Sequence, residues 1–342
     1  MISFKICARR IWKEIDRSQK ILLHLHPSPD GDSVGSSLAF YHALTKLGKE
    51  VSLIQGDTPL PQNLSHLPGA NKITPQNINQ IDLTTFDLFI ILDSSSSNQI
   101  TKLPKFKLPK KLKTIVIDHH QSNKKFGKIN LVLPNVPATA QIVFELLNYR
   151  KIKITPQIAA CIYVGIYTDS GGFRYFNPSY KTFNIASQLA KIYPKFPKLI
   201  FEIENNDYPD RLKFISLMLS SIKTFYSHHV AVASISYDQI TSNNLDLNSI
   251  GGYSDVANMI KAVVGWEIAV TLVELQPGIV KASFRTRDSD TYDMSKIAVA
   301  TKNGGGHKAA AGATLNMGLE KSRDLLLSII KKLHPKIDQE VK

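Results

Sequence analysis

The chain has 342 residues, a formal net charge of +14 and 43% hydrophobic residues, which is typical of a globular protein long enough for two domains. No apolar run approaches the ~18 residues that a membrane helix requires. The first twenty residues mix basic and acidic side chains, unlike a secretory or transit peptide. Cys7 and Cys161 lie far apart in the sequence. We therefore expect a cytoplasmic protein without a disulfide framework and without a membrane partner.

The positive charge comes mostly from lysine, and it has two interpretations. It could reflect binding to a polyanion, or it could be a compositional bias of the source proteome. One group is more local and consists of Lys102, Lys105, Lys107, Lys110, Lys111, Lys113, Lys124, Lys125 and Lys128. This lysine-rich segment could steer a phosphorylated substrate, or it could simply be a solvated loop.

The predicted elements begin with an amphipathic helix near the amino terminus. Its inner face would carry Ile2, Ile6, Ile11 and Ile15. From residue 21 to about 190, short apolar runs alternate with segments of helical period, including residues 33–47 and 139–147. This alternation predicts an α/β domain with a mainly parallel sheet and helices on both faces. Gly35, Ser36 and Ser37 would let the first of these helices pack closely beneath the loop that precedes it.

Four apolar runs in this region each end in aspartate or histidine. We interpret the runs, residues 21–25, 88–92, 114–117 and 161–166, as strands. The polar residues that follow them are His26, Asp30, Asp32, Asp93, Asp118, His119, His120 and Asp169. Ligands of open α/β folds bind at the carboxyl ends of the strands. We therefore predict one metal site assembled from four strand ends.

The residue types indicate which metal this site would bind. Four carboxylates (Asp30, Asp32, Asp93 and Asp169) and two imidazoles (His26 and His119) form a hard ligand set without a thiolate. Such a set favours Mn²⁺, or Mg²⁺, over a structural zinc ion. Four carboxylates can balance two divalent ions, as two-metal phosphoester hydrolysis requires. His120 would meet the phosphate charge. Each aspartate taken separately could instead be a turn residue or a helix N-cap.

A second, smaller α/β domain is expected after residue 228. Prolines near residues 193–197 interrupt the first pattern, and a helix over residues 210–225 would serve as a connector. The later elements are a strand at 230–235, a helix at 254–264, a hairpin of residues 268–275 and 279–287, and a helix at 319–333. We accordingly place the domains at residues 1–193 and 228–342, with a helical linker at 194–227.

Two further segments could contact a substrate. Gly304, Gly305 and Gly306 would expose backbone N–H groups to an anion in a tight loop-to-strand connection, with His307 and Arg285 as phosphate partners. A flexible glycine loop is the alternative, and Arg287 could be a solvated neighbour. Phe173 and Tyr175 could stack on a base, or could be core aromatics.

These motifs resemble the DHH/DHHA1 phosphoesterase superfamily over nearly the whole chain. The segment from His26 to Ser36 is similar to its first motif, Asp93 to its second, Asp118-His119-His120 to its third and Asp169 to its fourth. Gly304-Gly305-Gly306-His307 is similar to the signature of the DHHA1 domain. Ser28 and Ser94–Ser97 depart from the family pattern without removing a ligand.

The resemblance implies specific roles. His26, Asp30 and Asp93 would hold one Mn²⁺, and Asp32, Asp93, His119 and Asp169 the other, so that Asp93 bridges the two. His120 would face the scissile phosphate, and Asp118 would orient an imidazole. The residues implied to be catalytic are therefore Asp93, His120 and Asp118. Mg²⁺ or Co²⁺ could replace Mn²⁺.

The two-domain layout is similar to the bifunctional oligoribonuclease and pAp phosphatase branch of the superfamily. This implies an active site between a DHH catalytic domain and a DHHA1 substrate-binding domain. The expected activity is hydrolysis of short oligonucleotides to mononucleotides and removal of the 3′-phosphate of pAp. The alternatives are a cyclic-di-AMP or pApA phosphodiesterase and a non-catalytic nucleic-acid-binding module. A homodimer is a possible assembly.

Overall fold

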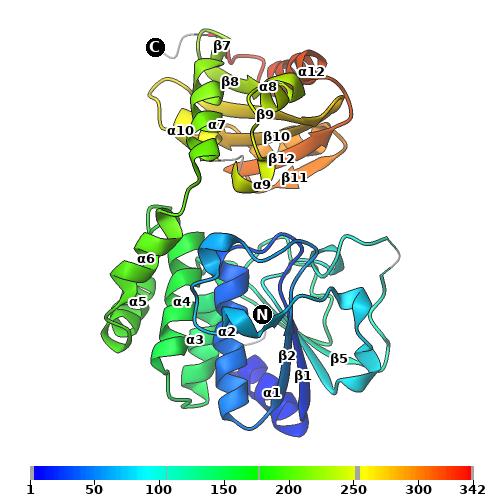
Figure 1. The fold of residues 1–342 in the computed structure, drawn as a ribbon, viewed down its shortest axis with the longest axis vertical. Coiled ribbons are helices and arrows are strands. Elements are labelled where there is room, and N and C mark those ends of the chain that lie inside the picture. Colours follow the sequence, from blue (N-terminus) through cyan, green and yellow to red (C-terminus); the bar gives the residue numbers. More distant parts are fainter. Residues whose placement is uncertain (1–3, 105, 176–177, 251–254, 340–342) are drawn as a thin grey trace. The chain divides into compact units, whose positions relative to one another are not determined.

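The computed structural model of the chain describes residues 4–104, 106–175, 178–250 and 255–339. The chain forms two compact units, Met1–Asn206 and Asp207–Lys342 (Figure 1). The boundary falls inside the segment expected as a linker, so its first part belongs to unit 1 and the rest to unit 2. Ile2, Lys105 and Ser254, which entered the sequence predictions, lie outside the described residues. No helix within the described ranges is both long and apolar enough to cross a membrane.

Unit 1 contains a six-stranded sheet in which every neighbouring pair is parallel. Its strands are β1 (Lys20–His24), β2 (Glu50–Ile54), β3 (Ile73–Thr74), β4 (Leu88–Leu92), β5 (Lys113–Asp118) and β6 (Ile129–Val132). The order is β3-β2-β1-β4-β5-β6. Strands β2 and β3 therefore lie on one side of β1, and β4, β5 and β6 lie on its other side. Such a switch point leaves a crevice at the carboxyl ends of the two central strands.

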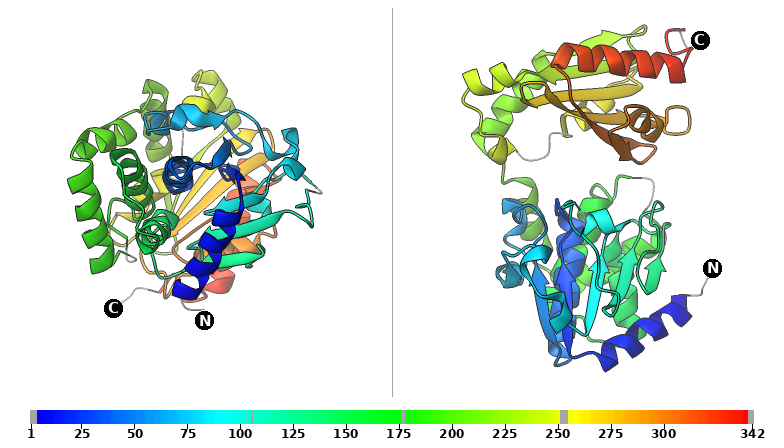
Figure 2. Two further views of the ribbon diagram at one scale, coloured as in Figure 1. Left: turned by 90° about the horizontal axis from the view of Figure 1, so that it is seen from below. Right: turned by 90° about the vertical axis from the view of Figure 1, so that its right-hand side faces the viewer.

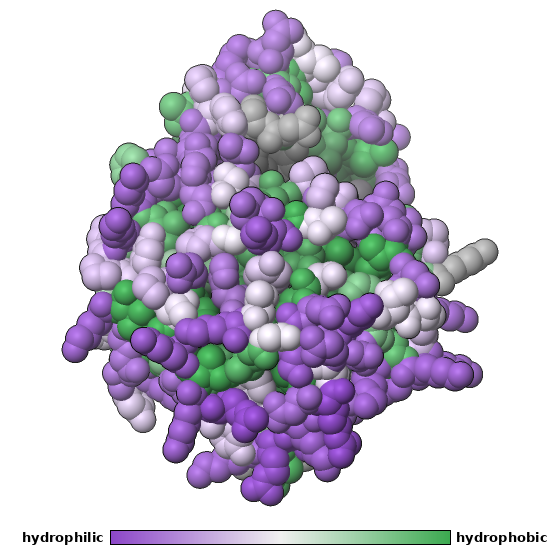
Figure 3. All heavy atoms as spheres, turned by 60° about the horizontal axis from the view of Figure 1, so that its bottom comes forward, coloured by the Kyte–Doolittle hydropathy of each residue, from purple (hydrophilic) through white to green (hydrophobic). Residues whose placement is uncertain are grey.

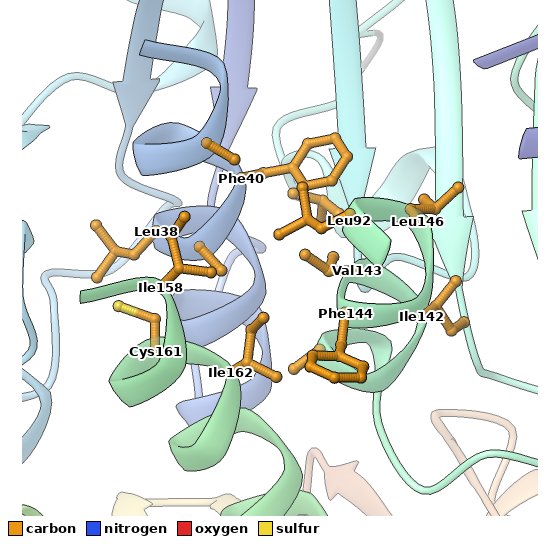
Figure 4. Close-up of a cluster of buried hydrophobic side chains, with 14 of the residues drawn as sticks. Leu38, Phe40, Leu92, Ile142, Val143, Phe144, Leu146, Ile158, Cys161 and Ile162 are labelled. Atoms are coloured by element: carbon orange, nitrogen blue, oxygen red, sulfur yellow. The ribbon is translucent and has the colours of Figure 1, made fainter. Parts of the chain in front are cut away.

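The α-helices of unit 1 are α1 (Phe4–Arg17), α2 (Gly31–Lys46), α3 (Thr139–Tyr149), α4 (Pro156–Asp169), α5 (Tyr180–Ile192) and α6 (Phe196–Glu204). Side chains of α2, α3 and α4 form a buried cluster with Leu92 of β4 (Figure 4). This cluster covers the face of the sheet that carries Ile21, Leu23 and Ile90. The parallel sheet flanked by helices, predicted from the sequence, is confirmed.

Helices also lie against the opposite face, but those described there are short 3₁₀ helices. The opposite face presents Leu22, Phe89 and Val116 to a cluster completed by Ile78 and Leu83. Those two residues belong to 3₁₀ helices, η3 (Ile78–Gln80) and η4 (Leu83–Thr85). Other short 3₁₀ turns are η1 (Gln62–Leu64), η2 (Ala70–Lys72) and η5 (Ser97–Gln99). Short polar connections can cover a sheet face without showing a helical period in the sequence.

The run of residues 161–166 is helical and lies inside α4, so its interpretation as a strand was wrong. A short apolar run fits a buried helix as well as a strand. The start signal is local: Thr155 caps the helix by accepting a hydrogen bond from Ile158 N, and Pro156 occupies its first turn. In α1, Ile11 and Ile15 are buried as expected, but Ile6 is 54% exposed.

Glycine allows close packing of α2 on α4, where the sequence suggested a role for Gly35 beneath the preceding loop. A Cβ at Gly35 would lie 2.4 Å from the carbonyl oxygen of Cys161. On α4, a Cβ at Gly165 would lie 2.5 Å from the Cβ of Ala140. The backbones of α2, α3 and α4 therefore approach too closely for larger residues at these positions.

Unit 2 contains a mixed sheet in the order β11-β12-β10-β9-β8-β7, labelled in Figure 1. Figure 2 shows the same sheet from two further sides. Its strands are β7 (Lys223–Phe225), β8 (Val230–Ile235), β9 (Ile268–Gln276), β10 (Ile279–Thr286), β11 (Gly304–Gly306) and β12 (Ala310–Leu315). Among the described strand pairs of this second sheet, only β8–β9 is parallel. The predicted hairpin is confirmed as β9 and β10, joined at Gly278 with a φ of 77°.

The helices of unit 2 are α7 (Pro209–Ser220), α8 (Tyr237–Ser242), α9 (Leu247–Ile250), α10 (Asp255–Lys261), α11 (Met294–Ala300) and α12 (Leu319–Leu333). The last coincides with the final helix predicted from the sequence. Phe214 and Met218 of α7 pack with Ala231 and Ala233 of β8. The helix expected as a connector is therefore part of a hydrophobic core of unit 2.

Candidate metal centre

The structure brings the predicted metal ligands and catalytic residues together at the carboxyl edge of the unit 1 sheet. They come from the loop after β1, the start of α2, the residue after β4, the end of β5 with its following loop, and the end of α4. These residues are His26, Asp30, Asp32, Asp93, Asp118, His119, His120 and Asp169. The site therefore uses three strand ends and one helix end, where the sequence suggested four strand ends.

The potential ligands form two sets on either side of Asp93. In the first, His26 Nε2 lies 3.6 Å from Asp30 Oδ2 and 3.6 Å from Asp93 Oδ2. In the second, His119 Nε2 lies 3.1 Å from Asp169 Oδ2 and 4.0 Å from Asp32 Oδ2. The other oxygen of Asp93, Oδ1, is 3.6 Å from His119 Nε2. Asp93 thus presents one carboxylate oxygen to each set.

The backbone at Asp93 is unusual for a residue with a side chain. Its φ is 51°, in the left-handed region, where aspartate is tolerated better than most residues. Its N–H donates to the carbonyl of Ile117 at 3.0 Å, which ties it to β5. This conformation turns the chain at the end of β4. Backbone strain of this kind is often kept where a side chain must take one position.

The amino terminus of α3 fixes two of the carboxylates. Asp32 Oδ2 accepts a hydrogen bond from Thr139 N at 2.6 Å, and Oδ1 accepts one from Ala140 N at 2.8 Å. Thr139 Oγ1 donates to Asp93 Oδ1 at 3.1 Å. Helix amino termini favour negative charge. Thr139 was not predicted as a site residue from the sequence, although a helix was predicted to begin at this residue.

Asp30 combines the two interpretations considered for the aspartates. Its Oδ1 caps α2 by accepting hydrogen bonds from Asp32 N at 3.1 Å and Ser33 N at 3.0 Å. Its Oδ2 faces His26. Although burial opposes ionisation, the hydrogen bond and charge of His26 lower the pKa of Asp30. Being an N-cap therefore does not exclude Asp30 from the ligand set.

Asp118 orients His120 through a contact with the ring nitrogen Nδ1. Asp118 Oδ1 lies 2.7 Å from His120 Nδ1, and Asn123 Nδ2 donates to Asp118 Oδ2 at 2.6 Å. Burial disfavours a cationic imidazole, but this hydrogen bond and the charges of Asp93 and Asp118 raise the pKa of His120 to about 9. Asn123, which also donates to the carbonyl of Ser94 at 3.0 Å, was not predicted from the sequence.

His119 is oriented by the backbone. Its Nδ1 lies 3.3 Å from the carbonyl oxygen of Val136, so the ring directs Nε2 toward the carboxylates. Imidazoles that bind metals are commonly held through their second nitrogen in this way. No residue type in the sequence points to this contact, because the partner is a main-chain oxygen.

The charge of the site fits divalent cations. Burial, followed by the negative charges of Asp93 and Asp169, raises the pKa of Asp32 well above its usual value. Burial and neighbouring carboxylates also raise the pKa values of Asp93 and Asp169. Clustered carboxylates in an interior need a compensating positive charge. Hard oxygen and nitrogen donors in two sets around one shared carboxylate are suited to two Mn²⁺ or Mg²⁺ ions.

In unit 2, the glycine run was expected as a tight loop leading into a strand. The strand that follows is confirmed as β12, but the glycines themselves form an edge strand, β11, and not a loop. A Cβ at Gly304 would lie 2.6 Å from the carbonyl oxygen of Gly312, whereas one at Gly305 would meet no atom within 4 Å. Gly306 has a φ of 142°, and a turn follows in which His307 N donates to the carbonyl of Ala310 at 2.8 Å. Gly304 therefore has a packing role, and Gly305 lies against open space.

Arg285 lies at the same end of this sheet as Gly306. Arg285 pairs with Ala310 across β10 and β12, and Gly306 pairs with the adjacent Ala311. The Arg285 guanidinium donates to Asn258 Oδ1 at 3.2 Å and to the carbonyl of Phe284 at 2.9 Å. The sheet register thus groups the substrate contacts expected in unit 2.

Arg287, expected as a solvated neighbour, and Phe173, considered as a stacking residue, both have structural roles. Arg287 Nη1 donates to the carbonyl of Lys261, the last residue of α10, and to those of Ala262 and Val263, which follow it. The Phe173 ring packs against those of Tyr163, Tyr167 and Phe183, so it is a core aromatic. Tyr175 is 49% exposed.

The lysine-rich segment is partly engaged in the fold. Lys113 forms an ion pair with Glu14 of α1, and Lys128 Nζ donates to the carbonyl of Lys110 at 2.8 Å. Lys102, Lys107, Lys111 and Lys124 are exposed or partly exposed. Both the substrate-steering and the solvated-loop interpretations therefore stay open for this segment.

Curated proteins of similar sequence cover most of the chain. The bifunctional oligoribonuclease and PAP phosphatase NrnA of Thermus thermophilus is 29% identical over 318 residues, which are 91% of this chain and 89% of that protein. The protein of the same name from Bacillus subtilis is 24% identical over 315 residues, covering 89% of this chain and 92% of that protein.

Solved structures support the fold. An exopolyphosphatase-related protein from Bacteroides fragilis matches with a TM-score of 0.86 at 23% identity and covers 98% of both chains. RecJ of Thermus thermophilus in complex with Mn²⁺ matches with a TM-score of 0.53 at 12% identity, over 96% of this chain and 54% of RecJ. At these identities the likeness concerns the fold alone.

Two family models match the chain, one in each compact unit. The model of the DHH family N-terminal domain matches residues 20–166, and the model of the DHHA1 domain matches residues 231–334. The first range contains seven of the eight residues gathered at the candidate metal centre, and Asp169 follows it closely. The chain therefore belongs to the DHH/DHHA1 superfamily of phosphoesterases.

Proposed function

We propose that this chain is a Mn²⁺-dependent phosphoesterase that hydrolyses short oligonucleotides to mononucleotides and removes the 3′-phosphate of pAp. One observation carries the proposal: two ligand sets share the carboxylate of Asp93, which is the arrangement that two-metal phosphoester hydrolysis requires. The names of the NrnA relatives support the choice of substrates.

Each metal ion would have its own ligands in addition to Asp93. His26 and Asp30 would hold the first ion, and Asp32, His119 and Asp169 the second. When bound, the ions would supply an activated water at neutral pH and neutralise the phosphate. Mn²⁺ is the expected metal, and Mg²⁺ or Co²⁺ would be the replacements to test.

The remaining residues of the site would serve the phosphate. His120 lies beside the ligand sets, and its Nδ1 is held by Asp118, which Asn123 supports in turn. An imidazole fixed in this way keeps its orientation while a phosphate enters. We assign His120 to contact with the scissile phosphate, and Asp118 to positioning of His120.

In unit 2, Arg285 and the segment from Gly304 to His307 would bind a terminal phosphate of the same substrate. The guanidinium provides charge-assisted donors, and Gly305 lets an anion approach the backbone without meeting a side chain. An oligonucleotide bound by such an anchor would be held at one end. This division of roles predicts a preference for short substrates.

The test uses purified chain depleted of metal with EDTA and then supplied with Mn²⁺. We expect release of mononucleotide from a labelled dinucleotide and of phosphate from pAp, both dependent on the metal. The Asp93→Asn variant, prepared in parallel, measures any contaminating nuclease. If wild-type chain released neither product above that background, the proposed function would be wrong. Cytoplasmic location and a homodimer stay predictions, the latter testable by light scattering.

A further inference from the structure

A cavity of about 330 Å³ lies between α1 and α3, and none of the proposed catalytic residues lines it. Its lining residues are Arg9, Trp12, Lys13, Asp16, Arg17, Tyr149 and Arg150. Four of these side chains are cationic, two are aromatic and one is a carboxylate. The volume is at the lower end of the range for small-ligand sites, ~300–1,000 Å³. The cavity therefore suits a compact ligand with negative charge.

The floor of the cavity is firmly built. Trp12 is only 3% exposed, and its Nε1 donates to the carbonyl of Leu146 in α3 at 3.1 Å. Ile11 and Ile15, on the same face of α1, are fully buried. These contacts fasten α1 to α3. The floor of the cavity is consequently a feature of the folded unit, whereas its rim consists of exposed side chains.

The cations on α1 are spaced so that they face the same way. Arg9, Lys13 and Arg17 follow one another at intervals of four residues, which places them on one side of the helix. No hydrogen bond or ion pair of their side chains occurs within the described ranges. Arg150, across the cavity, pairs with Asp16 at 3.1 Å. Like charges at this spacing destabilise a helix slightly, so an anion between them would relieve repulsion.

The cavity is at the opposite edge of the sheet from the metal centre. Glu14 of α1 pairs with Lys113, the first residue of β5, whereas Asp118 is the last residue of that strand. Likewise, α3 begins at the metal centre with Thr139 and ends at the cavity with Tyr149, about 16 Å away. The end of unit 1 that carries α1 comes forward in Figure 3 and shows a largely hydrophilic surface.

We propose that this cavity binds a nucleoside monophosphate. The phosphate would lie between Arg9, Lys13 and Arg17, where charge-assisted hydrogen bonds compensate its two negative charges. The base would contact the ring of Tyr149, which is 37% exposed. Binding at this position uses no metal ligand and does not rest on the proposed function.

The proposal is tested by titration calorimetry of the full chain with AMP and with inorganic phosphate, in EDTA and at low salt. EDTA removes the metal ions that would bind AMP at the catalytic centre. We expect AMP to bind, and the double variant Arg9→Glu/Lys13→Glu to weaken its Kd at least about tenfold. The matched control is Lys5→Glu/Arg10→Glu, which changes the same charge on exposed residues of α1 outside the cavity. It should change Kd less than about threefold.

Tyr149→Ala separates the nucleoside from the phosphate. This substitution should raise the Kd for AMP several-fold and leave phosphate binding unchanged. The proposed binding site would be rejected if the wild-type chain did not bind AMP in EDTA. It would also be rejected if both double variants weakened AMP binding equally. Phosphate binding as tight as AMP would contradict the role of the base. Thermal melting of each variant confirms folding, and Arg9→Ala/Lys13→Ala is the milder second variant.

Discussion

The candidate catalytic residues of unit 1 and the candidate substrate contacts of unit 2 are supported in different ways. Asp32 and Asp93 are 1% and 3% exposed, and hydrogen bonds from the start of α3 hold their oxygens. Gly305 and His307, in contrast, lie on an edge strand and in the turn after it, both exposed. Groups that must meet reacting atoms need fixed positions, whereas a group that binds the end of a substrate tolerates some freedom.

This difference predicts which kinetic constant each unit controls. Variants in unit 1 should lower kcat, because they change interactions made in the transition state. Variants in unit 2 should raise KM, because they change binding that substrate and transition state share. The expectations below test this separation, beginning with the largest effect.

Asp93→Ala should lower kcat by at least about 1,000-fold, because one carboxylate is proposed to serve both metal ions. Single-turnover assays at saturating Mn²⁺ measure the loss. Asp82→Ala, at an exposed residue that caps η4, is the control and should leave kcat unchanged. A near-wild-type rate for Asp93→Ala would show that the bridging role is wrong.

Thr139→Val should lower kcat or Mn²⁺ affinity by about 10- to 100-fold, the range seen when a residue supporting a metal ligand is lost. Valine keeps the shape of threonine but removes the hydroxyl that donates to Asp93. The backbone N–H bond to Asp32 remains. Thr139→Ser keeps the hydroxyl and should retain most activity. Equal activity of both variants at limiting Mn²⁺ would contradict the supporting role.

Much of the fold and of the metal centre could be predicted from the sequence. The apolar runs before Asp93 and Asp118 have the length and composition of buried parallel strands, and both are strands in the structure. The run from Cys161 to Ile166 has the same composition but is helical. Composition does not distinguish a buried strand from a buried helix. The helix start signal at Thr155-Pro156 does distinguish them.

The supporting contacts of the site were harder to predict. Thr139 and Asn123 act on residues far away in the sequence, or on main-chain groups whose positions depend on the whole fold. The glycine run was misinterpreted for a related reason. Gly304 is required by the approach of Ala298 and Gly312, which no local pattern records. Ligands could be predicted by residue type, but their neighbours required the tertiary structure.

Arg285→Ala should raise KM for a dinucleotide by about tenfold with little change in kcat, because a charge-assisted contact is worth about 1.5–3 kcal/mol. Steady-state kinetics over a range of substrate concentrations separate the two constants. Arg287→Ala is the matched control, since Arg287 contacts carbonyls after α10 and is not proposed to meet substrate. If Arg285→Ala lowered kcat and left KM unchanged, its role as an anchor would be wrong.

The two glycines of β11 should respond differently to alanine. Gly304→Ala should lower the stability of unit 2, because the new Cβ would lie 2.6 and 2.7 Å from two backbone oxygens. Gly305→Ala meets open space and should leave the melting temperature unchanged, while raising KM a few-fold by obstructing an anion. Thermal melting and kinetics on the same preparations separate the effects. An unchanged KM for Gly305→Ala would remove Gly305 from the anchor.

The last prediction concerns the length and end of the substrate. If Arg285 and the segment Gly304–His307 hold a terminal phosphate, the anchor cannot act on a cyclic dinucleotide, which has none. Recognition of a terminal phosphate also favours substrates whose scissile ester lies few nucleotides from that terminus. We therefore expect pApA and di- to pentanucleotides to have a kcat/KM several-fold higher than cyclic-di-AMP, and a 24-mer to be cleaved poorly.

The comparison is sharpened by measuring the same four substrate classes with Arg285→Ala. Loss of the anchor should reduce kcat/KM for the linear substrates toward the value for cyclic-di-AMP, which itself should hardly change. If the lysine-rich segment steers substrate, it would act in the opposite direction, because a basic approach favours longer strands. A wild-type preference for the 24-mer would therefore assign substrate selection to those lysines, and a preference for cyclic-di-AMP would contradict terminal recognition altogether.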